Sequence, residues 1–305
     1  MSDFQGARPL ISVVIPTYRR WDRLQLTLAA LEAQTCPHEW FEVIVSDDGS
    51  GDGTVEQVRA YAMRSRLRIT VVTGPNGGPS AARNRGINSC QGTWIAMTDD
   101  DCVPEPEWLA KHLAFIEAHP EVGGVGGQVI GYTTGIISRY VDWSKVMLPH
   151  IGRDGRASYL VTANALFKRE LVERLGGFDE TYKWPGGEDP DLSFRAAAIG
   201  AILLYDPTPV VRHMHRETVR GTYRMFWHHG LGLGALQVIK GKHLARSFRF
   251  VLKNQLIPGV KRAFIERPFR EALVFAYLEC VRHWAFRRGV LAYSGLVGTG
   301  TTSAN

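Results

Sequence analysis

The chain has 305 residues, 45% of them hydrophobic and 22% charged, and its formal net charge is +6. This composition is typical of a soluble globular protein with one large or two smaller domains, and no charge-free apolar stretch of about 18 residues could cross a bilayer. We expect a cytoplasmic location, because the four cysteines lack zinc-type spacing and the N-terminus does not resemble a signal peptide.

The first hundred residues alternate between predicted strands and helices. Short β-branched or apolar runs predict strands at 11–16, 41–46, 67–73 and 93–98, and helical spacing predicts helices at 20–34, 54–63 and 80–88. This alternation indicates an α/β fold with a mostly parallel sheet covered on both faces. Ligands bind at the carboxyl ends of the strands in such sheets, where Asp47, Asp48 and the triplet Asp99–Asp101 fall. These carboxylates could therefore converge on one crevice.

The second half of the chain is less regular. Apolar runs predict strands at 122–132, 159–167, 201–205 and 209–211, and a helix is expected at 189–198. From Thr218 onward the pattern becomes helical, and Gly241, Pro258, Gly259 and Pro268 divide it into about three helices. No internal repeat or low-complexity linker forces a division into separate domains.

Three consecutive aspartates, Asp99, Asp100 and Asp101, follow the apolar run 93–98. Three like charges at the end of a strand are costly unless a cation lies beside them. Mg²⁺ and Mn²⁺ take oxygen ligands and are often held by one or two carboxylates together with substrate phosphates. The triplet therefore suggests a metal site that receives a diphosphate, and the alternative is a solvated acidic turn or helix cap before Pro104.

Five segments, in this order and spacing, resemble the motifs of family 2 glycosyltransferases of the GT-A fold. The resemblance covers residues 10–215 and implies a GT-A Rossmann-like, mostly parallel sheet flanked by helices. Residues 1–215 would then be the nucleotide-sugar-binding and catalytic domain, with the acceptor side at 120–215, and 216–305 a basic helical extension. The segments are Ile15-Pro-Thr-Tyr18, Val45-Ser-Asp-Asp-Gly-Ser50, Gly77-Gly-Pro-Ser-Ala-Ala-Arg-Asn-Arg-Gly86, Asp99–Asp101 and Gly186-Gly-Glu-Asp-Pro-Asp-Leu-Ser-Phe-Arg195.

The resemblance implies donor-binding roles for several of these residues. Pro16, Thr17 and Tyr18 would line the nucleotide base, Asp48 would bond the base or ribose, and Arg83 would face the base or the diphosphate. These assignments suit the chemistry, because a carboxylate accepts N–H and hydroxyl donors and a guanidinium matches phosphate oxygens. Without the resemblance, Asp48 would be part of an ordinary polar turn and Arg83 part of a solvated helix face.

The resemblance also divides the aspartate triplet by role. Asp101 is the first choice for the metal, Asp99 for the ribose or a second metal contact, and Asp100 for the sugar. His213 is the expected histidine ligand, with His215 as its substitute, although a lone histidine is more often structural.

A second chemical site is expected at Glu188 and Asp189. The resemblance assigns Asp189 the role of general base toward the acceptor, and Glu188 would bind acceptor hydroxyls or share the proton. The alternative is a helix N-terminal cap. The preceding Gly186 and Gly187 favour the catalytic interpretation, because glycine leaves room for a sugar beside the backbone.

The C-terminal residues 211–305 carry 16 Lys and Arg against four Asp and Glu, whereas residues 1–210 carry 20 against 26. This asymmetry suggests an anionic surface, lipid or acceptor as partner, or else a basic helical cap on the acidic half. A predicted helix at 268–288 mixes aromatic residues with arginine and could lie on an anionic bilayer. The apolar residues surround this helix, which favours a buried helix slightly.

Taken together, these features predict an inverting, metal-dependent glycosyltransferase that uses Mn²⁺ or Mg²⁺. The donor would be a nucleoside diphosphate sugar, with UDP as the family default, and the acceptor a hydroxyl of a saccharide, a lipid-linked saccharide or a small metabolite. No nucleic-acid partner is expected, and the location would be the cytoplasm or the inner face of the membrane. The alternatives are a sugar-1-phosphate nucleotidyltransferase, which would normally show a glycine-rich basic loop after the first strand, an aspartate-nucleophile phosphatase, and a non-catalytic nucleotide-sugar-binding relative.

Overall fold

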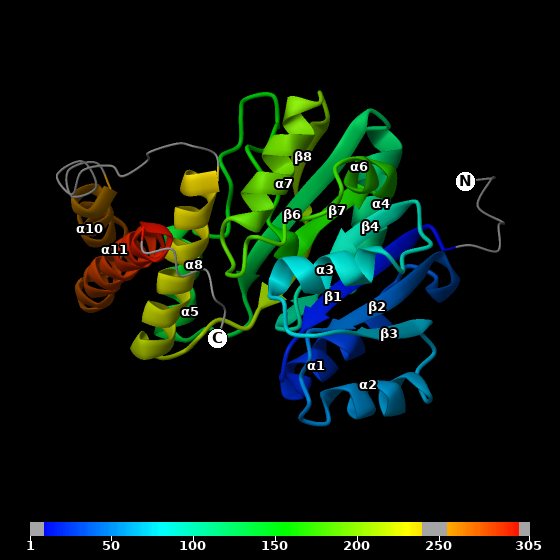
Figure 1. Ribbon diagram of the computed structural model, residues 1–305. Coiled ribbons are helices and arrows are strands. Elements are labelled where there is room, and N and C mark those ends of the chain that lie inside the picture. The colour runs from blue at the N-terminus through cyan, green and yellow to red at the C-terminus, as the bar shows by residue number, and fades with distance from the viewer. Residues whose placement is uncertain (1–8, 240–254, 299–305) are drawn as a thin grey trace. The chain divides into compact units, whose positions relative to one another are not determined.

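The computed structural model describes residues 9–239 and 255–298 (Figure 1). The predicted helix break at Gly241 lies outside these ranges. Contacts divide the chain into two compact units. Unit 1 comprises the described parts of Met1–Tyr132, Val146–Lys183 and Asp189–Met214, and unit 2 those of Thr133–Lys145, Trp184–Glu188 and His215–Asn305.

Unit 1 contains an eight-stranded mixed sheet with the strand order β3-β2-β1-β4-β7-β6-β8-β5. The β1, β2, β3 and β4 strands pair in parallel, as do β6 and β8, whereas β4–β7, β6–β7 and β5–β8 are antiparallel. The strands are β1 Ile11–Thr17, β2 Phe41–Asp47, β3 Ile69–Thr73, β4 Trp94–Met97, β5 Cys102–Pro104, β6 Val122–Gly131, β7 Ala165–Lys168 and β8 Ile202–His213.

Helices cover both faces of this sheet (Figure 1). Alternate residues of each inner strand point to opposite faces, so Val13 and Val43 pack with Leu24 and Leu28 of α1, whereas Val14 packs on the other side. The helices of unit 1 are α1 Trp21–Glu32, α2 Thr54–Ala62, α3 Pro79–Ile87, α4 Trp108–Ala118, α6 Arg169–Arg174 and α7 Glu188–Ala198, whose first residue belongs to unit 2.

The predicted alternation of the first hundred residues is confirmed. Its functional consequence is that β2, β1 and β4 are neighbours in the sheet and run in parallel, so their carboxyl ends lie at one edge. Asp48 follows β2, Tyr18 follows β1, and the aspartate triplet begins two residues after β4.

The predictions for the second half were less accurate. The strand expected at 159–167 is a 3-10 turn, Thr162–Asn164, followed by the short strand β7. The side chain of Asn164 anchors this turn by donating to the carbonyls of Gln128 and Pro209. The two strands expected near 201–205 and 209–211 form one strand, β8, which pairs with β6 through register shifts. The β5 strand and the helices α4, α5 and α6 were not predicted.

Unit 2 is helical and comprises α5 Ile136–Ser144, α8 Val219–Ile239, α10 Ile257–Glu266 and α11 Phe269–Gly298. The expected helix at 268–288 is therefore longer than predicted. Phe275 of α11 packs on α5, with its ring centroid 5.5 Å from Tyr140 and 5.2 Å from Trp143. Glycine allows α8 and α11 to approach closely, because a Cβ on Gly230 would overlap the carbonyl of Phe286. Within the described ranges, each helix is too short or too polar to span a membrane.

A buried polar cluster links α4 to β6 and β8 in unit 1. Asn164 Oδ1 accepts hydrogen bonds from Trp108 Nε1 at 2.7 Å and from His112 Nε2 at 3.0 Å, and its Nδ2 donates to the carbonyls of Gln128 and Pro209. Burial lowers the pKa of His112 from 6.5 to about 4, because a charged imidazole is costly to desolvate.

The buried His112 should make the fold sensitive to acid. Because the pKa of His112 is lower in the folded protein, the unfolded chain binds more protons between pH 6.5 and 4. The contribution of His112 to the free energy of unfolding is therefore fully present above pH 6.5 and is lost as the pH falls toward 4. We expect this loss to lower the free energy of unfolding by about 2 kcal/mol between pH 7 and 5. Urea unfolding of the wild type and of His112→Gln at both pH values tests this prediction, and an equal pH dependence in the two proteins would contradict it.

Candidate active site

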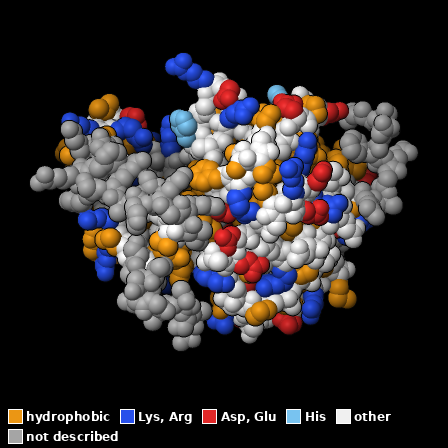
Figure 2. All heavy atoms as spheres, turned by 45° about the horizontal axis from the view of Figure 1, so that its top comes forward, with side chains coloured by type: hydrophobic (Ala, Val, Ile, Leu, Met, Phe, Trp, Pro, Cys, Tyr) orange, Lys and Arg blue, Asp and Glu red, His pale blue; other side chains and the backbone are white. Residues whose placement is uncertain are grey.

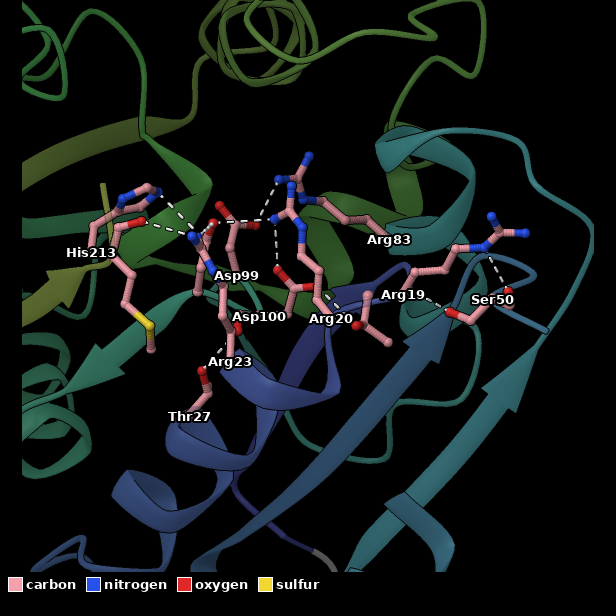
Figure 3. A network of polar contacts seen from close by, with 12 residues as sticks. Arg19, Arg20, Arg23, Thr27, Ser50, Arg83, Asp99, Asp100 and His213 are labelled. Atoms are coloured by element: carbon pink, nitrogen blue, oxygen red, sulfur yellow. Dashed lines mark hydrogen bonds and ion pairs between the residues drawn. The ribbon is translucent and has the colours of Figure 1, made fainter. Parts of the chain in front are cut away.

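The residues at the carboxyl ends of β1, β2 and β4 lie close together in unit 1 (Figure 3). Thr17, the last residue of β1, donates a hydrogen bond from Oγ1 to Asp100 Oδ2 at 2.9 Å. Arg19 joins the turns after β1 and β2, because its backbone N–H donates to Ser50 Oγ and its Nε–H to the Ser50 carbonyl, both at 2.8 Å. The side chains that follow β1, β2 and β4 therefore meet at one edge of the sheet, as the strand order predicted.

Each carboxylate of the triplet faces an arginine (Figure 3). Arg20 NH1 lies 3.0 Å from Asp100 Oδ1 and 3.1 Å from Asp101 Oδ2, and Arg23 NH1 lies 3.1 Å from Asp101 Oδ2. Arg83 NH2 lies 3.0 Å from Asp99 Oδ1. Three guanidinium groups already offset the charge of the triplet, so this charge by itself does not require a bound metal ion.

Arg20 and Arg23 were not among the predicted site residues. Arg20 is the N-cap residue of α1 and Arg23 lies in its first turn, shortly after the strand β1 that ends at the site. A basic pair in that position, opposite an acidic triplet, is the signal that could have identified them.

Burial and charge act in opposite directions on Asp100. Burial, the largest effect, raises the pKa of Asp100, whereas Arg20 and the Thr17 hydroxyl lower it by stabilising the carboxylate. The charge of Asp100 in turn raises the pKa of Arg20, which stays protonated. The middle aspartate is therefore held by the protein on several sides and is buried, with 4% of its surface exposed.

Asp101 and His213 meet because β5 pairs with β8 in antiparallel register. Cys102, the first residue of β5, stands opposite His213, the last residue of β8, and His213 Nε2 lies 3.4 Å from Asp101 Oδ1. Asp101, Cys102 and His213 are the one group of three metal-type ligands within 4.8 Å of one another among residues 9–239 and 255–298. Asp99 lies outside this group.

This donor set fits a divalent cation that is completed by ligands from a substrate. Asp101 Oδ1 supplies a hard oxygen and His213 a neutral imidazole nitrogen, which suit Mn²⁺ and related ions. Burial raises the pKa of the Cys102 thiol well above its usual value, so the neutral thiol, a poor ligand, is favoured. Asp101 and His213 would therefore hold the ion. His215 is not a member of this group, and its Nε2 lies 3.4 Å from Asp142 Oδ1 in unit 2.

Arg23 should orient the metal site. Its NH1 donates both to Asp101 Oδ2 and, at 3.0 Å, to the carbonyl of Met214, so it ties the aspartate turn to the residue after His213. The other oxygen of Asp101 is thereby turned toward His213. Loss of such a supporting contact typically weakens metal binding 10–100-fold.

We expect Arg23→Gln to lower Mn²⁺ affinity about tenfold, measured by calorimetry, and Arg23→Lys, which keeps the charge, to lower it less. Arg19→Gln is the control, because Arg19 bonds Ser50 instead of the triplet. An unchanged or higher affinity in Arg23→Gln would show that the guanidinium competes with the ion rather than orienting its ligand.

Asp189 is held beside the triplet by two segments of unit 1. The backbone N–H and the hydroxyl of Thr162 donate to its two carboxylate oxygens at 3.0 and 2.9 Å. Arg83 lies between the two acidic groups, with NH2 3.0 Å from Asp99 and NH1 3.9 Å from Asp189. The Arg83 side chain is buried and its guanidinium carbon lies 5.5 Å from the centre of the Phe178 ring. Thr162 was also overlooked in the sequence, where nothing marks it.

Asp48 shapes the loop that enters α3. Its carboxylate accepts the backbone N–H groups of Gly77 at 3.0 Å and Gly78 at 2.8 Å. Arg85 NH2 also lies 3.7 Å from Asp48 Oδ1, so the protein holds both oxygens of this carboxylate. Pro16 is half-buried within β1, and Tyr18 is 39% exposed beside Arg19.

Glu188 is buried in unit 2, where its Oε2 accepts the N–H groups of Gly186 at 2.7 Å and Gly187 at 3.0 Å. The prediction that this glycine pair leaves room for a sugar is wrong at Gly186. A Cβ there would lie 3.0 Å from the backbone of His229, so the space is taken by α8.

Comparisons with known proteins identify the family to which the chain is similar. The model of the family "Glycosyl transferase family 2" matches residues 12–176. Glycosyltransferase AglE of Haloferax volcanii is 31% identical over 56% of this chain and 56% of its own length. The pre-mycofactocin glycosyltransferase of Mycobacterium tuberculosis is 30% identical over 69% of this chain and 44% of its own. The chain thus spans about half the length of these relatives.

Two solved structures share the fold. The mannosyltransferase PcManGT of Pyrobaculum calidifontis, in complex with GDP-Man and Mn²⁺, aligns with a TM-score of 0.67 and 22% identity, over 97% of this chain and 88% of the other. Residues 1–349 of S. aureus TarS, in complex with UDP-GlcNAc, align with a TM-score of 0.54 and 17% identity, over 93% and 91%. The fold of this chain is therefore the GT-A fold with additional C-terminal helices.

Proposed function

The chain belongs to glycosyl transferase family 2, and on this basis we propose that it transfers a sugar from a nucleoside diphosphate donor to an acceptor hydroxyl. The observation that carries the proposal is the position of Arg83, whose guanidinium contacts Asp99 on one side and approaches Asp189 on the other. The Arg83 guanidinium therefore lies between Asp99, which suits donor binding, and Asp189, which suits the role of general base.

In the proposed reaction, Asp189 removes the proton from the acceptor hydroxyl as it attacks the anomeric carbon. Thr162 fixes the direction of both Asp189 oxygens, so the carboxylate is oriented before the acceptor arrives. One base and one displacement give inversion at the anomeric carbon.

On the donor side, Pro16, Thr17 and Tyr18 would line the base, and Arg83 would face the diphosphate. We propose a uridine diphosphate sugar, because a carboxylate such as that of Asp48 can accept the imide N–H of uracil or the ribose hydroxyls. Asp99 and Asp100 would contact the ribose and the sugar. Asp101 and His213 would hold a divalent cation, Mn²⁺ or Mg²⁺, which when bound would neutralise charge on the leaving diphosphate.

We also propose that residues 1–215 form the catalytic domain, with 216–305 as its helical extension, and that the protein resides in the cytoplasm. The second proposal is supported by the cysteines, all four of which are free thiols in this structure and three of which are buried.

A donor panel tests the function. Purified protein is mixed with UDP-glucose, UDP-N-acetylglucosamine and GDP-mannose, with Mn²⁺, Mg²⁺ or a chelator, and release of nucleoside diphosphate is measured with simple glycosides as acceptors. Metal-dependent release from one donor supports the proposal. Donor binding in calorimetry without release would favour a non-catalytic relative. Release of pyrophosphate from a nucleoside triphosphate and a sugar 1-phosphate would instead identify a nucleotidyltransferase.

A further inference from the structure

The helix α11 has two apolar faces, one buried and one exposed. Ala272, Phe275, Leu278 and Ala285 pack inside unit 2. Five large side chains, which we call the α11 stripe, remain exposed, each by about half of its surface or more: Phe269 70%, Leu273 49%, Tyr277 56%, Trp284 59% and Leu291 54%.

The α11 stripe is continuous along the helix. At about 100° per residue, its five members fall within an arc of roughly 80°, opposite the buried residues. Exposed Cys280 falls within the same arc. The sequence showed apolar residues all around this helix, and the structure separates them into a buried face and an exposed one, on which Trp284 also contacts Tyr223 of α8 at 5.3 Å between ring centroids. Burial within unit 2 therefore explains only part of the pattern.

The charges beside the stripe are all positive in the described part of the helix. Arg270, Arg287 and Arg288 are exposed and lie within about 100° of the stripe's first residue. The two acidic residues of α11 point elsewhere, since Glu279 is buried and hydrogen-bonded by Arg282, whereas Glu271 pairs with Arg139 at 3.4 Å. Among the described side chains of α10 and α11 that Figure 2 colours, hydrophobic and basic ones are interspersed.

The apolar surface continues onto α10. Phe264 and Ile265 are 44% and 83% exposed, and the ring of Phe264 lies 6.2 Å from that of Phe269. Lys261 is exposed on the same helix, and so is Glu266, whose carboxylate pairs with Arg262 at 3.6 Å. The corner between the two helices thus presents aromatic and aliphatic side chains beside a further cation.

We propose that the α11 stripe lies on the surface of an anionic lipid bilayer, with the helix parallel to the membrane. Exposed aromatic and aliphatic residues flanked by arginine suit the boundary between headgroups and acyl chains. The charged residues of α11 prevent it from crossing the bilayer. Two copies of the stripe would bring like-charged arginines together without an acidic partner, which disfavours self-association. The proposal is independent of the proposed sugar transfer.

Cys280 provides a direct probe of this face. It is the exposed cysteine, whereas Cys36, Cys90 and Cys102 are buried and their thiol pKa values are raised by burial, so a thiol-reactive, environment-sensitive fluorophore should label Cys280 selectively. The labelled full chain is titrated with vesicles of phosphatidylcholine mixed with phosphatidylglycerol, without any sugar donor. Vesicles of pure phosphatidylcholine are the uncharged comparison, and co-flotation of unlabelled protein is measured in parallel.

We expect a blue shift of the probe and co-flotation with anionic vesicles, both reduced by added salt. The double variant Leu273→Glu/Leu291→Glu should lose at least about tenfold in vesicle affinity, because it places carboxylates on the stripe. Met63→Glu is the matched control, since Met63 is 90% exposed on unit 1 and should leave affinity unchanged. Unfolding curves check that both variants fold.

Three results would overturn the proposal. Absence of binding to anionic vesicles at low salt would exclude the membrane contact. Full binding by the double variant would show that another part of the chain meets the lipid. A blue shift that depends on protein concentration and needs no vesicles would identify the stripe as a contact between two copies of the chain.

Discussion

Replacing Asp189 by asparagine should lower kcat by about 10³-fold and leave donor affinity within about threefold of the wild type. The amide cannot accept the acceptor proton, but it has the size of the carboxylate and can still accept the Thr162 N–H, so the site should keep its shape. Initial rates at saturating donor, together with calorimetric titration of the donor, measure the two effects separately.

Asp179→Asn is the matched control for this variant, because Asp179 is an aspartate of unit 1 that bonds only its own turn in the described contacts, through Thr181. Thr162→Val should give an intermediate loss, since it removes the hydroxyl that orients Asp189 and keeps the backbone contact. A rate for Asp189→Asn within a few-fold of the wild type would remove Asp189 as the base and leave the helix-cap interpretation.

Replacing Asp101 by asparagine should weaken Mn²⁺ binding by at least about 100-fold and slow transfer by about 10³-fold. Asp101 is the charged member of the Asp101–His213 pair, and an amide oxygen is a weaker ligand than a carboxylate. The loss also leaves Arg20 and Arg23 without one of their acidic partners, which adds repulsion toward a cation. Calorimetric titration with Mn²⁺ measures the affinity for the metal, and initial rates at varied Mn²⁺ concentration measure the rate of transfer.

Asp99→Asn is the informative comparison for Asp101. Asp99 lies outside the metal-type cluster and pairs with Arg83, so its substitution should change metal affinity much less and affect donor binding instead. If Asp99→Asn weakened Mn²⁺ as strongly as Asp101→Asn, Asp99 would be a ligand in its own right. If neither variant changed metal binding, the assignment of the ion to this strand end would be wrong.

The sequence predicted the local features of the site well. Strands and helices of the first hundred residues follow from the spacing of apolar residues within ten or so positions, and the aspartates fall where strands end. The parallel neighbours β2, β1 and β4 then bring Asp48, Tyr18 and Asp99 to one edge. Two further local features favour these elements: β1 is rich in β-branched residues, which favour a strand, and Pro79 lies in the first turn of α3, where proline favours the start of a helix.

What the sequence determined by itself is therefore the family motifs, the alternating elements and the identity of the acidic residues, all of which are encoded within short stretches of chain. Only the tertiary structure decided which groups face them. His213 reaches Asp101 through the pairing of β5 with β8, more than a hundred residues apart, and Thr162 reaches Asp189 from a separate segment. Arg20 and Arg23 offset the negative charge of the aspartate triplet, which in the sequence had suggested only a metal ion as its partner. Which face of α11 is exposed likewise depends on which helices cover its other face. Burial and ion pairing arise from contacts between segments that are distant in the chain, so they leave no periodic pattern in the local sequence.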